Sequence, residues 1–325
     1  MALANQKREA GMYKVKIIDE KKKNNLMEKY YSNKLFEHKA NIHGVCTKIF
    51  TDNKQIAEMW KENFEEMPEW VRPHTRVFAI SDGKRLEVLY EPNSKTVFIK
   101  NCDYYGWIKS IALGLVAEFM EDFFSEHRRY SIHGSFIDHN GKGMAIIGPS
   151  GSGKTTLTYG ILLDRSYNFL TDDWFFVRLF DDSIKVYSSE KNSYIRNDLA
   201  TNWPKLKNKL VTLTLDNKQR AIIDVKKFFG AKRIVYESSL CLIILLIRDK
   251  EMPFLTKLDS KKAIKFMMDN DFCNPHQLLR TTNKIGRRKS FFMNIFKRVP
   301  VYLLNTIESP QQSLERLKKI AQEYL

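Results

Sequence analysis

Residues 148–155 read GPSGSGKT and match the phosphate-binding loop pattern G-x-x-x-x-G-K-[ST] at every fixed position. The apolar run 144–147 before the loop predicts a buried strand, and residues 156–163 after it predict the start of a helix. Such a loop needs both neighbours, because its backbone N–H groups turn inward around a phosphate at the helix N-terminus. The motif therefore restricts this part of the chain to an α/β fold.

The same loop predicts a nucleoside triphosphate site. ATP is the donor that we expect there, although the loop does not distinguish among ATP, ADP and GTP. The Lys154 ammonium can reach the β and γ phosphates, and the Thr155 hydroxyl can bind Mg²⁺. Kinases, motors and switches share this loop, so the motif alone does not say where the γ-phosphoryl group goes. The predicted nucleotide-binding residues are Gly148, Pro149, Ser150, Gly151, Ser152, Gly153, Lys154, Thr155 and Thr156.

Length and composition predict an ordered protein, with two domains of ordinary size or one large domain with an appendage. The chain has 325 residues, of which 43% are hydrophobic, enough for a sizeable core. Its four cysteines lack the spacing of a zinc site or of a disulfide framework. The apolar stretch 240–247 is far shorter than the roughly 20 residues that a membrane-spanning helix needs. We therefore expect a cytoplasmic protein without a membrane span.

The formal net charge of +16 indicates anionic partners, which include nucleic acid, an acidic protein and anionic ligands. Residues 272–307 contain no acidic residue at all. Within them, the basic stretch 280–290 is expected to form a mobile lid over phosphates, a surface for an acidic acceptor, or simply an exposed basic loop. Nucleic acid is not the favoured partner, because no recognised binding module or aromatic stacking array accompanies the charge.

Residues 1–125 are expected to form a smaller α+β domain. Three strand-like runs, 76–80, 86–90 and 96–100, are separated by turn-forming residues and predict an antiparallel meander. Residues 107–128 then carry apolar side chains at helical spacing, which predicts an amphipathic helix.

Residues 126–325 are expected to form the nucleotide-binding domain. The segment 131–147 predicts two strands joined by a hairpin at Asn140 and Gly141, and the second strand leads into the phosphate loop. A later strand ends at Asp172 and Asp173. Carboxylates at the end of a strand beside a phosphate loop can contact a metal ion or an attacking hydroxyl.

Phosphoryl transfer needs neutralised phosphate charge and a group that accepts the proton of the acceptor hydroxyl. Lys154 is a candidate for the first task and Asp173 for the second, with Asp172 as a candidate Mg²⁺ ligand. The structural alternative is that Asp172 and Asp173 only cap a turn and take no part in chemistry. Asp249, which follows the apolar strand 241–247, is a competing Mg²⁺ acid in the manner of a motor ATPase.

Residues 131–173 resemble the catalytic region of the HPr kinase/phosphorylase family. They share its Ser-Ile-His-Gly opening, its hairpin, its phosphate loop and helix, and its strand closing with two aspartates. A second similarity covers 221–225 and 229–231, which read AIIDV and FGA. Together these segments make up about a third of the chain, all in its C-terminal half.

The resemblance implies a phosphate-loop kinase domain with a mixed central sheet flanked by helices, as in HPr kinase and phosphoenolpyruvate carboxykinase. It implies transfer of phosphate from ATP to a serine hydroxyl, and an oligomer of identical chains. At matching positions it implies that Asp173 accepts the proton and that His133 is catalytic. A lone histidine before glycine is otherwise a structural residue, and that alternative stays open.

The chain departs from the family pattern at two places. Thr156 stands where the family has glutamate after the loop hydroxyl. The acidic metal-binding segment is replaced by DNKQR, which keeps an acid at Asp216 but no glycines. We therefore expect a divergent serine-type kinase that uses Mg²⁺ held by Thr155, Asp172 and Asp216. Its acceptor is expected to be a hydroxyl of a protein, a peptide or a small molecule. The alternative function is a nucleotide-gated nucleic-acid-binding protein or a regulatory nucleotide-binding module.

Overall fold

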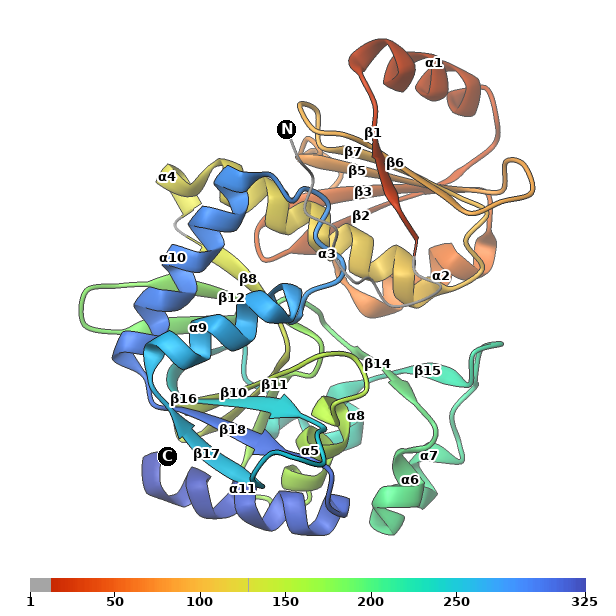
Figure 1. The fold of residues 1–325 in the computed structure, drawn as a ribbon. Helices are drawn as coiled ribbons and strands as arrows, with labels where there is room; N and C mark the ends of the chain where they lie inside the picture. The colour runs from red at the N-terminus through yellow and green to blue at the C-terminus, as the bar shows by residue number, and fades with distance from the viewer. Residues whose placement is uncertain (1–12, 128) are drawn as a thin grey trace. The chain divides into compact units, whose positions relative to one another are not determined.

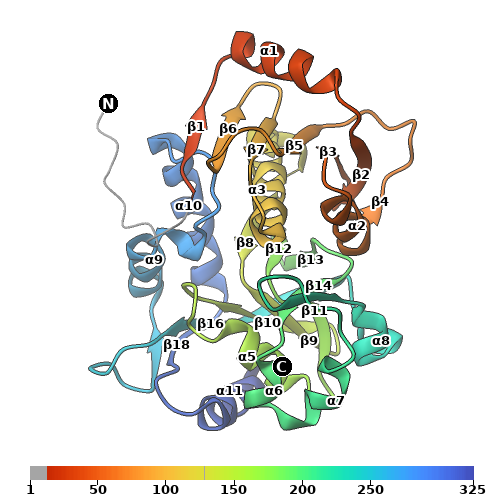
Figure 2. The same cartoon turned by 90° about the vertical axis from the view of Figure 1, so that its right-hand side faces the viewer.

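The computed structural model describes residues 13–127 and 129–325, so the first residues of the predicted N-terminal domain lie outside the described part. The chain divides into two compact units (Figure 1, Figure 2). The first consists of Met1–Phe124 with Pro275–Leu279, and the second of Ser125–Asn274 with Arg280–Leu325. Each unit is described by itself. None of the helices in the described ranges combines the length and the apolar content that crossing a bilayer requires.

The first unit is built on a seven-stranded mixed sheet with the strand order β1-β6-β7-β5-β3-β2-β4. Phe78 and Phe98 stack on neighbouring strands of this sheet, with ring centroids 4.8 Å apart. The strands are β1 (Val15–Ile17), β2 (Phe36–Ile42), β3 (Val45–Thr51), β4 (Glu65–Glu66), β5 (Thr75–Ile80), β6 (Glu87–Glu91) and β7 (Thr96–Lys100). The helices are α1 (Glu20–Tyr31), α2 (Lys54–Asn63) and α3 (Tyr105–Asp122), with the short α4 (Phe124–His127) at the boundary.

The expected antiparallel meander is wrong. Strands β6 and β7 do form an antiparallel hairpin, but β5 lies on the other side of β7 and runs parallel to it. Strands β5 and β7 are buried along most of their length, as is typical of central strands in a parallel arrangement. Turn residues show where strands end, but they do not show which strand edges pair.

Helix α3 is buried on nearly every side, and it packs against the segment Pro275–Leu279 within the first unit. The backbone N–H of Leu279 donates to the Glu118 carboxylate at 3.2 Å. The Tyr13 hydroxyl and His276 Nδ1 are hydrogen-bonded at 2.8 Å. A Cβ at Gly114 would lie 2.6 Å from the His276 carbonyl oxygen, so glycine is required where this segment crosses the helix.

The second unit is built on a nine-stranded mixed sheet, in which β10, β16 and β18 run parallel. The path β11-β9-β10-β16-β13-β12-β8 includes seven strands, while β18 pairs with β16 and β17 with β18. The strands are β8 (Arg129–His133), β9 (Ser135–His139), β10 (Lys142–Ile147), β11 (Asn168–Thr171), β12 (Trp174–Leu179), β13 (Ile184–Ser188), β16 (Glu237–Ile247), β17 (Leu255–Leu258) and β18 (Val301–Asn305). A separate two-stranded sheet contains β14 (Ser193–Arg196) and β15 (Arg220–Ile223).

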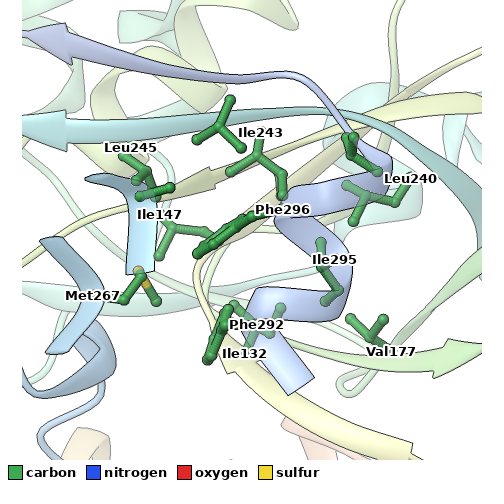
Figure 3. Packing of buried hydrophobic residues seen from close by; sticks show 14 of the residues in the cluster. Ile132, Ile147, Val177, Leu240, Ile243, Leu245, Met267, Phe292, Ile295 and Phe296 are labelled. Carbon is green, nitrogen blue, oxygen red and sulfur yellow. The ribbon is translucent and has the colours of Figure 1, made fainter. Parts of the chain in front are cut away.

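Helices cover both faces of the large sheet and make two hydrophobic clusters. On one face, α9 (Ser260–Asp269) and α10 (Thr282–Arg298) bury Met267, Phe292 and Ile295 among strand residues (Figure 3). On the other, α5 (Lys154–Ile161) and α11 (Pro310–Tyr324) bury Leu157 and Leu317. The mixed central sheet flanked by helices is therefore as predicted. The remaining short helices are α6 (Leu199–Asn202), α7 (Lys207–Leu210) and α8 (Val225–Phe229).

The basic stretch 280–290 is not a mobile loop, because most of it belongs to α10. The Thr281 hydroxyl caps this helix by accepting the backbone N–H of Lys284. Its later turns bury four apolar side chains at helical spacing: Phe291, Phe292, Ile295 and Phe296. The first turns carry mainly polar and basic residues, so they lack the apolar spacing from which a helix is predicted.

We predict that Gly114→Ala destabilises the protein although alanine is the better helix former. Overpacking against the His276 carbonyl costs about 1–3 kcal/mol, which outweighs the gain in helix propensity of about 1 kcal/mol. Gly286→Ala in α10 is the matched control, since a Cβ there meets nothing within 4 Å. It should raise the free energy of unfolding by about 0.5–1 kcal/mol. Urea denaturation of both variants measures the difference, and equal stabilisation would contradict the packing described here.

Candidate active site

The phosphate loop connects β10 to α5, as its motif requires. Gly151 and Gly153 have φ values of 76° and 96°, in the left-handed region that glycine adopts without strain. Gly148 is required by space instead, since a Cβ there would lie 2.5 Å from Ser152 Oγ and 2.9 Å from Leu246 Cβ. The loop is thus closely fitted against the end of β16.

Lys154 begins α5, and its ammonium group folds back over the loop. Its Nζ donates to the carbonyl oxygens of Gly148 at 2.7 Å and of Pro149 at 3.1 Å. The positive charge therefore lies above the loop backbone, where phosphate oxygens would replace these carbonyls as partners.

Two residues that the sequence analysis missed hold the loop and its helix. The Thr306 hydroxyl donates to the Ser152 carbonyl at 2.7 Å. Thr306 directly follows β18, and parallel strands end at the same edge of the sheet, so its position was in principle predictable. Trp203 Nε1 donates to the Thr156 carbonyl at 2.8 Å, and its ring packs against Gly160 of α5. No motif marks Trp203.

His133 reaches the site by a route that the sequence analysis did not predict. The segment before the hairpin is broken at Gly134 into two strands: β8 pairs with β12, while β9 pairs with β10. His133 ends β8 and therefore does not lie on the strand beside β10. A Cβ at Gly134 would lie 2.8 Å from the Ile146 carbonyl, which shows that the break packs directly on the strand leading to the phosphate loop.

The two aspartates lie in a second break, between β11 and β12, and the two breaks are bonded together. The Gly134 backbone N–H donates to the Asp173 carbonyl at 2.8 Å. The Ser135 hydroxyl donates to the Asp172 carbonyl at 2.9 Å. This pair of breaks, defined by Gly134 and by Asp172 and Asp173, is called the strand corner below. It brings the predicted acids and His133 to the end of β10.

His133 and Asp173 form a close pair at the strand corner. His133 Nε2 lies 3.2 Å from Asp173 Oδ1, and His133 Nδ1 lies 2.7 Å from the carbonyl oxygen of Cys273. A carbonyl oxygen only accepts hydrogen bonds, so Nδ1 carries a proton. The contact between Nε2 and the carboxylate then also requires a proton, because two acceptors do not bond. The pair therefore holds one proton between the imidazole and the carboxyl group.

The pKa shifts of Tyr159 and Cys273 show that the strand corner and the segment that binds His133 lie near α5 and Lys154. Burial raises the pKa of the Tyr159 hydroxyl on α5 well above its ordinary value, and the negative charge of nearby Asp172 raises it further. Burial also raises the pKa of the Cys273 thiol to about 12, and the Lys154 ammonium opposes that shift. Asp172 thus lies near α5, and Lys154 lies within electrostatic reach of the segment that binds His133.

The other two acids proposed as metal ligands take part in turns. Asp216 Oδ1 accepts the backbone N–H groups of Lys218 at 2.8 Å and of Arg220 at 3.0 Å, and the Tyr194 hydroxyl bonds Oδ2. Asp249 Oδ1 accepts the N–H of Glu251 at 2.8 Å. Each carboxylate therefore stabilises its own turn, and the metal role of Asp216 stays a prediction.

Within the described ranges, no group of three or more histidine, cysteine or acidic side chains forms a ready metal site. Magnesium in phosphoryl-transfer sites usually has one or two protein ligands besides phosphates and water. Thr155 at the start of α5 and Asp172 at the strand corner are residues of the right kind for that small donor set.

Sequence comparisons relate the chain to bacterial kinases, although no protein-family model matches it. The HPr kinase/phosphorylase of Chlorobium luteolum is 25% identical over 144 residues, which are 44% of this chain and 37% of that protein. That of Chlorobium limicola is 28% identical over 123 residues, 38% of this chain and 31% of that protein. The chain thus aligns with about a third of the length of these relatives.

Among solved structures, the Hpr(Ser) kinase/phosphatase from Coxiella burnetii matches with 19% identity and a TM-score of 0.33. That match covers 59% of this chain and 98% of the other. The mixed sheet and the phosphate-loop motif define the class of protein, an α/β protein with a phosphate-binding loop. Over about two fifths of its length the chain is similar to proteins named HPr kinase/phosphorylase, at 25–28% identity.

We predict that Gly148→Ala lowers the affinity for ATP by about 10- to 100-fold. A Cβ at this position clashes with Ser152 inside the loop and with Leu246 of β16, and the loop must shift at an overpacking cost of about 1–3 kcal/mol. Ser150→Ala is the control, because this side chain is exposed and its backbone N–H remains. Calorimetric titration with a non-hydrolysable ATP analogue measures both. An unchanged affinity for Gly148→Ala would show that the loop does not bind phosphate in this conformation.

Proposed function

We propose that this protein is an ATP-dependent kinase that transfers the γ-phosphoryl group to a serine-type hydroxyl of a protein, a peptide or a small molecule. The observation that carries the proposal is the pair of His133 and Asp173, 3.2 Å apart, at a corner packed on the strand that leads into the phosphate loop. Its sequence relatives are named HPr kinase/phosphorylase, which supports the same chemistry.

The phosphate loop is proposed to bind the triphosphate. Its backbone N–H groups and the Lys154 ammonium would neutralise charge on the β and γ phosphates. Mg²⁺, when bound, would add positive charge between these phosphates, with the Thr155 hydroxyl and the Asp172 carboxylate as its protein ligands. Asp216 is not needed for this arrangement, since its carboxylate already accepts two hydrogen bonds from its own turn and one from the Tyr194 hydroxyl on β14.

Asp173 is proposed to accept the proton of the attacking hydroxyl. With the shared proton on His133, Asp173 is a carboxylate and can take that proton as the new O–P bond forms. At the same time the bond from the γ-phosphorus to the bridging oxygen breaks, and ADP leaves. His133 remains hydrogen-bonded to Asp173 throughout, which holds the carboxylate toward the site and stabilises its charge.

The acceptor is proposed to be an anionic protein or peptide in preference to a small molecule. A formal net charge of +16 favours encounter with a negatively charged partner. Transfer of label from γ-labelled ATP to free serine, acidic proteins and a peptide library tests the proposal directly. Label that appears only as inorganic phosphate with every acceptor would refute kinase activity.

We predict that Asp173→Asn lowers the transfer rate by about 10²–10⁴-fold, because an amide cannot accept the hydroxyl proton. The affinity for ATP should stay within about twofold, since phosphate binding depends on the loop and Lys154. Single-turnover transfer and calorimetric titration give the two values. Asp249→Asn is the matched control and should leave both unchanged. Loss of ATP binding in Asp173→Asn would instead make Asp173 a metal-binding or structural residue.

A further inference from the structure

Three successive residues between α9 and α10 have left-handed backbone conformations. Asp271, Phe272 and Cys273 have φ values of 49°, 54° and 53°, and none of them is glycine. Residues other than glycine rarely adopt this backbone conformation. A run of three such residues persists only where surrounding contacts hold it. Such strained segments cluster at functional sites, which makes the contacts of this left-handed turn informative.

The left-handed turn supplies the hydrogen bond that orients His133. The Cys273 carbonyl oxygen accepts the proton of His133 Nδ1 at 2.7 Å. That bond leaves Nε2 as the ring atom that faces Asp173. In the opposite tautomer a neutral imidazole would present an N–H to Asp173 but would lose its bond to the carbonyl. The position of the Cys273 carbonyl oxygen therefore decides that Nε2, and not Nδ1, is the ring nitrogen that His133 presents to Asp173.

Arg280 holds the left-handed turn from the residue next to the cap of α10. Its Nη2 lies 2.8 Å from Asp271 Oδ2, and its Nε donates to the same oxygen at 3.0 Å. Nη2 also reaches the Asn274 carbonyl at 3.5 Å. The Arg280 side chain is only 11% exposed, so this ion pair is largely shielded from water. On the other side, the Phe272 ring stacks on Phe292 of α10.

We propose that Arg280 is a positioning residue for the phosphoryl-transfer site. Through its ion pair with Asp271 it fixes the Cys273 carbonyl, and through that carbonyl it fixes the proton on Nδ1 and the orientation of His133. The kinetic part of this inference rests on the proposed kinase function. The effect on the His133 tautomer does not.

The alternative is that Arg280 and Asp271 only fasten the connection between two helices. In that case their loss would lower stability but leave the imidazole of His133 unchanged. Arg298 provides a matched control on the same helix, since its Nη2 donates to the Ser183 carbonyl at 3.0 Å at the opposite end. Arg298→Gln removes a comparable guanidinium contact without touching the left-handed turn.

The test is ¹⁵N NMR of histidine-labelled full-length protein, with the His133 signal assigned by its loss in His133→Gln. Arg280→Gln should lower the fraction of His133 rings that carry a proton on Nδ1, so that some rings carry their only proton on Nε2, whereas Arg298→Gln should not. Transfer to an accepted substrate should fall about tenfold in kcat, with KM for ATP unchanged. Arg280→Lys, which keeps the charge, should recover part of both effects.

An unchanged His133 signal in a folded Arg280→Gln variant would overturn the proposal. If that variant does not fold, Asp271→Asn removes the same ion pair from the other side, and the same NMR outcomes decide. If wild-type protein transfers no phosphate to any acceptor, the kinase proposal fails. The tautomer measurement still decides the role of Arg280 in that case.

Discussion

The backbone hydrogen bond between Gly134 and Asp173 is the contact on which the site depends. It ties the break between β8 and β9 to the break between β11 and β12, so that two strand pairs change direction at one place. Because Gly134 has no side chain, this corner can press against the Ile146 carbonyl just before the phosphate loop. A short distance in space thus separates residues that lie tens of positions apart in the chain.

The local parts of the site could be predicted from the sequence, because each has a strong local signal. The phosphate loop has fixed glycines, the β9–β10 hairpin has Asn140 and Gly141 at its turn, and β12 follows directly after the two aspartates. The break at Gly134 could not be predicted in the same way. Its cause is a close approach of two backbones, and a sequence does not show which backbone will be near.

The same limit explains the error over α10 and applies to Asp216. Arg280 was expected in a basic segment that forms a lid over phosphates or an exposed loop, yet its partner is Asp271, which a left-handed turn brings back toward it. The carboxylate of Asp216 accepts two backbone hydrogen bonds within its own turn, and its metal role stays a prediction. In each case the charge was recognised correctly, but its partner was set by backbone geometry that charge patterns do not encode.

The segment Pro275–Leu279 has a consequence for dividing this protein. The backbone leaves the second unit after Asn274, contributes five residues to the first, and returns at Arg280. A chain cut near residue 125 would therefore keep Leu278 and Leu279 while losing the helix that receives them. The first unit likewise cannot be produced whole as one continuous piece of the gene. A single cut in the chain therefore cannot separate the two units with each left whole.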